Sequence, residues 1–142
     1  VRPHTAELGL VEGTDTFRDV DRNDDAHPIP GLLVYRIDDE LFFANAAFFV
    51  GDVRKRLIGS DPPATALVID AEGVSDIDST ALGALEQLVD DLDEAGVAMY
   101  AARVRQPVRD MIGRSGLRDR IGEREIFLEV DDAVEYLTAD DE

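Results

Sequence analysis

The chain has 142 residues and no cysteine, which excludes disulfide bonds, thiol chemistry and metal sites built on cysteine. It also has no apolar run close to the roughly 20 residues that a membrane-spanning helix needs, and no signal peptide is visible. Because the first residue is Val1 rather than methionine, we expect a fragment or an excised domain. The length suffices for one domain with a proper hydrophobic core.

Basic residues are scarce as well. The 14 lysine and arginine residues face 32 aspartate and glutamate residues, the formal net charge is −18, and Lys55 is the only lysine. Nucleic acids and anionic lipid surfaces bind basic patches, so this composition argues against both as partners. We therefore expect no nucleic-acid partner.

Residues that commonly carry out catalysis are few. The only histidines, His4 and His27, fall in a polar N-terminal stretch, and the chain has neither a G-x-S-x-G motif nor a glycine-rich phosphate loop. Asp76 and Asp78 are conceivable as a metal-binding or acid–base pair, but helix capping accounts for Asp78 without a metal. We expect no enzymatic activity, no cofactor and no metal site.

Short apolar runs alternate with helical patterns from residue 31 onward, which is typical of βα units. Residues 1–30 are polar and are interpreted as a lead-in with a possible first strand at 8–11. Residues 31–142 are expected to form one α/β domain, with a mixed, mostly parallel sheet of about four or five strands and about four or five helices. Strands are predicted at 31–37, 41–43, 66–69, 97–102 and 126–128, the first two as a hairpin. Helices are predicted at 46–58 (with Asn45 as N-cap), 79–95, 107–116 and 131–137.

The segment from Asp70 to Leu82 joins a buried strand to a helix with apolar residues at helical spacing. At this turn, Asp78 or Ser79 is expected to accept hydrogen bonds from the free N–H groups of the first helical turn. The hydroxyls of Ser79 and Thr80 then lie where the helix dipole and unpaired amides favour an anion. Two interpretations stay open: the residues only cap the helix, or the hydroxyls form an anion-accepting site.

Arginines cluster in the second half of the chain. Within 22 residues lie Arg103, Arg105, Arg109, Arg114, Arg118, Arg120 and Arg124. Since the carboxyl ends of parallel strands meet at one edge of a sheet, Arg103 and Arg105 are expected on the same edge as the two hydroxyls, as a possible anion or nucleotide site. Equally supported is the alternative that the arginines neutralise neighbouring acids such as Asp110 and Asp119.

These motifs carry a family resemblance. Asp70–Val74 followed by Asp76–Thr80 resembles the signature of STAS domains, which sulfate transporters share with anti-sigma factor antagonists. Arg105–Arg109 with Ser115–Leu117 resembles the next helix of the family and its end. One position departs from the pattern, because the family often has glycine where Ala81 stands.

Upstream residues distinguish the two branches of the family. Leu8–Gly9, Gly13–Val20, Pro30–Gly31 and Leu41–Ala46 are similar to the segment after the last membrane span of SulP-type anion permeases, which free-standing antagonists lack. The resemblance implies the C-terminal regulatory domain of a secondary transporter for sulfate or a related anion, on the cytoplasmic side of the plasma membrane. It implies the transmembrane domain of the same polypeptide as a partner, and a homodimer of the intact transporter.

The resemblance also implies site residues. In anti-sigma factor antagonists the residue matching Thr80 is phosphorylated, and an aspartate matches Asp78. Thr80, Ser79 and Asp78 are therefore candidates for phosphorylation or for binding a regulatory protein. Two alternatives remain: a free-standing phospho-switch that binds a kinase-like anti-sigma factor, and a nucleotide- or anion-binding module that uses Arg103 and Arg105.

The charge of −18 predicts that the isolated chain is monomeric or only weakly dimeric, even where an intact transporter is a dimer. Salt screens repulsion between like charges, so any self-association should strengthen as salt is added. Analytical ultracentrifugation at low and high ionic strength measures this. A tight dimer at low salt would contradict the prediction.

Overall fold

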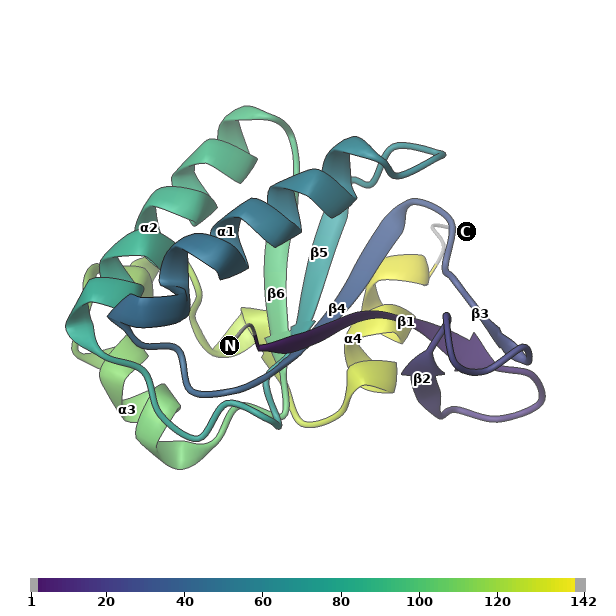
Figure 1. Ribbon diagram of the computed structural model, residues 1–142, viewed down its shortest axis with the longest axis horizontal. Coiled ribbons are helices and arrows are strands. Elements are labelled where there is room, and N and C mark those ends of the chain that lie inside the picture. Colours follow the sequence, from purple (N-terminus) through teal and green to yellow (C-terminus); the bar gives the residue numbers. More distant parts are fainter. Residues whose placement is uncertain (1–2, 140–142) are drawn as a thin grey trace.

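A computed structural model describes residues 3–139 of the chain. Its strands are β1 (His4–Val11), β2 (Phe17–Asp19), β3 (Ala26–His27), β4 (Leu32–Asp38), β5 (Ala66–Asp70), β6 (Ala98–Ala102) and β7 (Ile126–Phe127). Its α-helices are α1 (Phe43–Ile58), α2 (Ser79–Glu94), α3 (Gln106–Gly113) and α4 (Val130–Thr138), and two short 3-10 helices, η1 (Gly116–Asp119) and η2 (Glu123–Glu125), follow α3. Figure 1 shows a twisted sheet with helices on both faces.

The sheet is mixed, and the expected α/β class is confirmed. Its strand order is β2-β1-β4-β5-β6-β7, with β3 also paired to β1. β1 runs antiparallel to its three partners, whereas β4 to β7 run parallel to one another. The described residues contain seven strands rather than four or five, because the polar lead-in supplies β1, β2 and β3. Ala6 and Leu8 are buried in β1, so the lead-in contributes to the core as well as to the sheet.

The predicted hairpin after β4 is wrong. Leu41 makes a single parallel bridge to Ile77, and Phe43 begins α1. Asn45 Oδ1 accepts the N–H of Phe42 at 3.0 Å, which satisfies a donor that helix geometry leaves free and starts the helix here. Asn45 therefore acts from within the first turn, and Phe42 holds the N-cap position that the sequence had given to Asn45. The other predicted elements from residue 31 onward agree with the observed bounds to within three residues.

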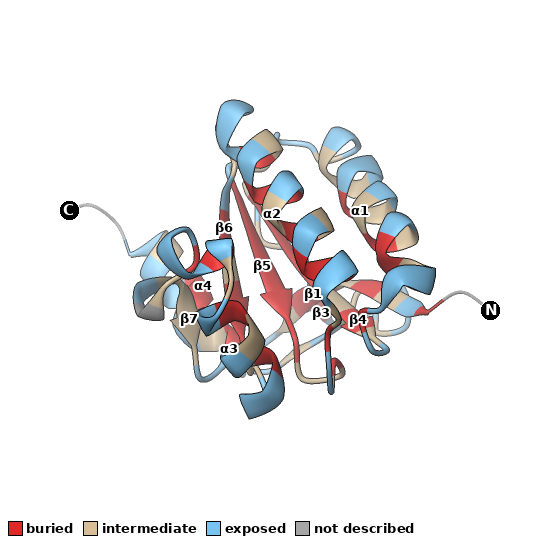
Figure 2. Cartoon of the chain, turned by 90° about the vertical axis from the view of Figure 1, so that its left-hand side faces the viewer, coloured by how far each residue is buried: buried red, intermediate tan, exposed pale blue. Residues whose placement is uncertain are grey.

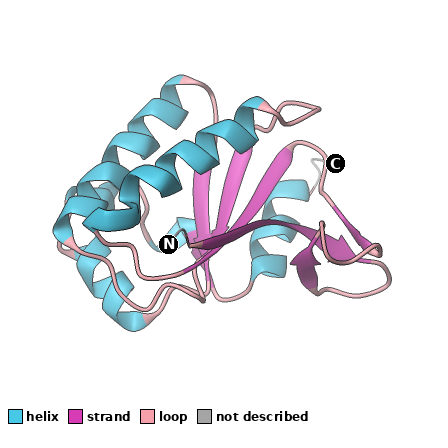
Figure 3. Cartoon of the chain, in the orientation of Figure 1, coloured by secondary structure: helices cyan, strands magenta, loops and turns pink. Residues whose placement is uncertain are grey.

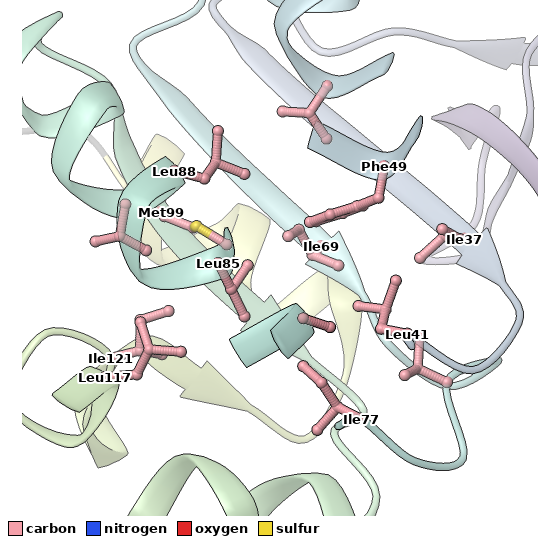
Figure 4. Packing of buried hydrophobic residues seen from close by; sticks show 14 of the residues in the cluster. Ile37, Leu41, Phe49, Ile69, Ile77, Leu85, Leu88, Met99, Leu117 and Ile121 are labelled. Atoms are coloured by element: carbon pink, nitrogen blue, oxygen red, sulfur yellow. The ribbon is translucent and has the colours of Figure 1, made fainter. Parts of the chain in front are cut away.

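The two faces of the sheet bury alternate side chains. In β4, Leu33, Tyr35 and Ile37 pack in the cluster with α1, α2 and α3, whereas Leu32 and Val34 pack in the cluster with α4. Figures 1 and 3 show α1 and α2 on one face and α4 on the other. Figure 2 shows buried strands between helices whose outer surfaces are exposed, and Figure 4 shows the larger cluster from close by. Both faces are thus covered, as parallel strands require.

A polar network ties the first strand to α1 beside this core. The buried hydroxyl of Tyr35 donates to Asp52 Oδ2 at 2.9 Å, Arg56 Nε donates to the same oxygen at 3.2 Å, and Arg56 Nη2 donates to Thr5 in β1 at 3.3 Å. Burial alone would raise the pKa of the Asp52 carboxyl, but hydrogen bonds from Thr5, Tyr35 and Arg56 outweigh burial and hold the pKa below its ordinary 3.8. The ionised carboxylate therefore contributes to stability.

Asp52→Asn is expected to lower the free energy of unfolding by about 2 kcal/mol at neutral pH, because charge-assisted hydrogen bonds are lost. Since the folded-state pKa lies below the ordinary 3.8, the contribution is complete above pH 3.8 and disappears as pH falls through the folded-state pKa. The difference between wild type and variant should therefore shrink in acid. Urea titrations followed by circular dichroism measure it. Tyr35→Phe is the matched variant that removes one donor only, with an expected cost of about 1 kcal/mol. A gap between wild type and Asp52→Asn that stays constant into acid would contradict the assignment.

Candidate functional site

The carboxylate of Asp78 caps two helices. Its Oδ1 accepts the N–H of Ala81 in the first turn of α2 at 2.8 Å, which confirms the predicted cap of this helix. Its Oδ2 accepts the N–H of Phe43, the first residue of α1, at 2.9 Å. The second cap was not expected, because no local sequence pattern connects residues 35 positions apart. The N-termini of α1 and α2 therefore meet at one side chain.

Backbone hydrogen bonds fix the loop that carries Asp78. The N–H of Leu41 donates to the Asp76 carbonyl at 3.0 Å, and the N–H of Asp78 donates to the Leu41 carbonyl at 3.1 Å. Leu41 and Ile77 are buried between these bonds and appear among the packed side chains of Figure 4. The turn is thus held by hydrogen bonds and by the core beneath it, and its outer residues are presented on a rigid support.

Ser79 and Thr80 are both exposed at the start of α2. Ser79 lines a shallow hollow of about 350 Å³ together with Glu86, Arg114 and Ser115. Arg114 Nη2 donates within the chain to the sulfur of Met111 at 3.4 Å, a weak acceptor. The arginine that shares a hollow with Ser79 is therefore Arg114, which the sequence gave no reason to prefer.

Ala81 does not narrow the approach to these hydroxyls. Ala81 is only 4% exposed and belongs to the core cluster under the turn. The methyl group that replaces the glycine common in STAS sequences is accommodated inside the protein.

Arg103 and Arg105 lie at the carboxyl edge of the parallel strands, where the sequence placed them, but they contact carboxylates. Arg103 donates from Nε and Nη2 to the two oxygens of Asp70 at 3.2 and 3.1 Å. Arg105 Nε donates to the carbonyl of Glu72 at 2.6 Å. Within residues 3–139, neither guanidinium contacts Ser79 or Thr80.

Asp70 is the centre of this ion-pair network. It is only 2% exposed, and Arg36 Nη1 in the neighbouring strand also donates to it, at 3.0 Å. Hydrogen bonds to Asp70 raise the pKa of Arg103 above its ordinary value, so Arg103 keeps its positive charge. Arg36 also pairs with Asp38 at 2.7 Å and with Glu72 at 3.0 Å. An incoming anion would have to displace these carboxylates before it could bind the arginines.

The sequence patterns did not predict that Asp70 and Arg36 belong to this network. They pointed to Asp110 and Asp119 as the acids that neutralise the arginines, because these two residues are close to the arginines along the chain. The parallel register aligns Arg36 with Asp70 across β4 and β5, and Arg103 follows directly after β6. To predict these ion pairs from the sequence, one would have to know which strands lie next to each other in the sheet.

Gly73 is required by the close approach of the loop after β5 to the end of β4. A Cβ atom on Gly73 would lie 2.9 Å from Cα of Asp38 and 3.0 Å from the carbonyl oxygen of Ile37, closer than side-chain atoms normally come. A glycine here lets the two loops pack together beside the ion-pair network.

The residues that the structure describes contain no group of three or more potential ligands placed to hold a metal ion. None of the helices between residues 3 and 139 is long and apolar enough to cross a bilayer.

Comparison with known proteins gives consistent results. The family model described as STAS domain matches residues 24–133. A probable sulfate transporter of Mycobacterium tuberculosis is 39% identical over 137 residues, which cover 94% of this chain and 24% of the relative. The chain thus spans about a quarter of the length of that curated relative.

Solved structures share the fold. The murine Solute Carrier 26 family member A9 anion transporter, in its inward-facing state, superposes with a TM-score of 0.87 at 23% identity, over 97% of this chain and 22% of that one. A putative anti-sigma factor antagonist of Thermotoga maritima gives a TM-score of 0.66 at 16% identity, over 78% of this chain and 90% of that one.

Asp78→Ala is expected to lower the free energy of unfolding by about 2 kcal/mol, because two helix N-termini each lose a cap worth about 1 kcal/mol. Asp78→Asn keeps one acceptor oxygen and should lose about half as much. Glu94→Ala is the control, since it removes the same charge from an exposed position of α2 that makes no side-chain hydrogen bond or ion pair within the described chain. Urea unfolding followed by circular dichroism measures all three. Similar stabilities of Asp78→Ala and Glu94→Ala would contradict the double cap.

Proposed function

The chain belongs to the STAS domain family, and on that premise we propose that it is the cytoplasmic regulatory domain of a SulP-like secondary transporter for sulfate or a related anion. The observation that carries the proposal is its 39% identity, over 94% of its length, to a probable sulfate transporter. That relative is about four times as long, which leaves room for membrane helices outside the aligned part. The proposed partner is the transmembrane domain of the same polypeptide, in a homodimeric transporter.

The lead-in strands favour a transporter over a free-standing antagonist. β1 to β3 extend the sheet on one side, and the anion transporter structure covers 97% of the chain, whereas the antagonist structure covers 78%. The larger share of this chain that superposes on the anion transporter supports this choice. A gene that encodes about ten apolar helices upstream of Val1 is expected from this proposal.

We infer that the turn made by Asp78, Ser79 and Thr80 is the regulatory surface. Asp78 is occupied by its two caps, so its role is to hold the turn in place. Ser79 and Thr80 are exposed and available to a kinase or a partner protein. No catalysis is proposed, because among the described residues no histidine contacts a serine or threonine hydroxyl as a general base would.

A phospho-switch that binds a kinase-like anti-sigma factor is the second candidate, and the exposure of the two hydroxyls favours it. A nucleotide or anion site at Arg103 and Arg105 has less support, because both residues already bind Asp70 or Glu72. Titration with labelled nucleotide at low and high salt tests for such a site, and nucleotide binding would distinguish a nucleotide-binding module from the other two functions.

Thr80→Glu is expected to leave the melting temperature close to that of wild type and to change transport by the full-length protein. The helix N-terminus stabilises a new negative charge by about 1 kcal/mol, while Asp76 and Asp78 repel it by a similar amount. The measurements are thermal unfolding of the chain and uptake of radiolabelled sulfate by cells that make the full-length variant.

Ala98→Glu is the matched control, since it adds the same charge at an exposed residue that begins β6, away from the turn. Normal uptake by a stable Thr80→Glu transporter would reduce the hydroxyls to structural residues of the helix start. Altered uptake by both variants would point to net charge alone.

A further inference from the structure

An exposed aromatic patch lies on the opposite side of the sheet from the regulatory turn. It consists of Tyr100 in β6, Phe127 in β7, Leu128 directly after it, and Tyr136 in α4. The three rings pack in a triangle, with centroid separations of 6.3, 6.1 and 5.7 Å. Leu128 and Tyr136 are 79% and 61% exposed, so a large apolar area faces outward. Figure 2 shows α4 and β7 together, at the far side of the molecule from α1.

The chain around the aromatic patch is rich in acidic residues. Residues 121–139 contain six acidic residues and one basic residue, Arg124. Elsewhere arginines pair with acids, but no ion pair among the described residues involves a residue beyond Arg120. Burial is the main cause that raises the pKa of Tyr100, and the charge of Glu125 adds to it, so Glu125 lies near this ring.

Aromatic faces and carboxylates attract the same kind of partner. The negative face of an aromatic ring attracts guanidinium and ammonium groups, and acidic side chains of this part of the chain, such as Glu125 near Tyr100, can pair with them. An anionic lipid surface would be repelled here. A second copy of the chain would bring a net charge of −18 against the same acidic surface. The charge of the aromatic patch therefore selects a basic segment.

We propose that the aromatic patch docks an arginine- or lysine-bearing segment of the membrane-embedded part of the same polypeptide. This inference rests on the proposed function, because it takes a membrane domain as the neighbour. Loops on the cytoplasmic side of membrane proteins carry an excess of lysine and arginine, and tethering gives such a loop a high effective concentration at this surface. Since α4 and α2 cover opposite faces of the sheet, docking here leaves Ser79 and Thr80 open to a separate regulator.

The experiment is site-specific photo-crosslinking in the full-length polypeptide, within its own membrane. A photoreactive phenylalanine analogue replaces Tyr136, and in a second variant Leu128. A third variant carries it at Ile58, which is 85% exposed at the end of α1 and serves as the control. Crosslinked peptides are mapped by mass spectrometry. Positions 136 and 128 are expected to give crosslinks to a lysine- or arginine-bearing segment outside residues 1–142, at about ten times the yield from position 58.

Charge reversal tests whether electrostatic attraction contributes to the docking. Glu135 makes no side-chain hydrogen bond or ion pair within residues 3–139, so Glu135→Lys should keep the fold and lower the crosslink yield from position 128 at least about threefold. Glu94→Lys changes the net charge equally on α2 and should leave the yield unchanged.

Crosslinks to residues 1–142 of a second copy, to lipid or to an unrelated protein would overturn the proposal, as would yields equal to that from position 58. Equal effects of the two charge reversals would also overturn it. Sulfate uptake by the same membranes tests the transport function separately. Uptake without the crosslink rejects the docking alone, whereas the crosslink without uptake rejects the transported anion and keeps the docking.

Discussion

The carboxylate of Asp78 joins the two helices on which the candidate surface is built. Each oxygen satisfies a backbone donor of a different helix, Phe43 in α1 and Ala81 in α2. A helix start has free N–H groups whose burial without a partner is costly, so two helices that begin side by side need an acceptor between them. Because one side chain supplies it, the orientation of α1 relative to α2 and the position of the exposed hydroxyls have the same structural origin.

The carboxyl edge of the sheet is organised by a second charge arrangement of a different kind. Asp70 is nearly inaccessible to water, and Arg36 and Arg103 approach it from the strands on either side. A buried charge without partners would be strongly destabilising, so the two arginines are needed to balance the Asp70 carboxylate. Arg103 adopts a left-handed backbone conformation, with φ of 57°, to reach it. That conformation is uncommon for a residue with a side chain, which indicates how firmly the surrounding contacts fix Arg103.

The parallel half of the fold could be predicted from local patterns, and the remainder depended on contacts between distant residues. The central helix and its Asp78 cap follow from apolar spacing and from a capping residue within one turn. The lead-in strands were underestimated, because β1 buries only small or isolated apolar side chains and its pairing with β4 is long-range. The expected hairpin is wrong for a related reason. Phe43 has a high strand propensity, which favoured a strand at 41–43, but its N–H donates to Asp78, from another part of the chain, and Phe43 begins a helix instead. The partners of Arg103 were unpredictable until β5 and β6 were known to be adjacent.

The placement of the tyrosines makes the aromatic patch optically visible. The chain has no tryptophan and three tyrosines, so its near-ultraviolet emission comes from tyrosine alone. Tyr35 lies in the core and donates its hydroxyl to the Asp52 carboxylate. The other two, Tyr100 and Tyr136, pack against each other in the patch at 6.1 Å. Two of the three native tyrosine fluorophores therefore report, without a label, on one small region of the surface.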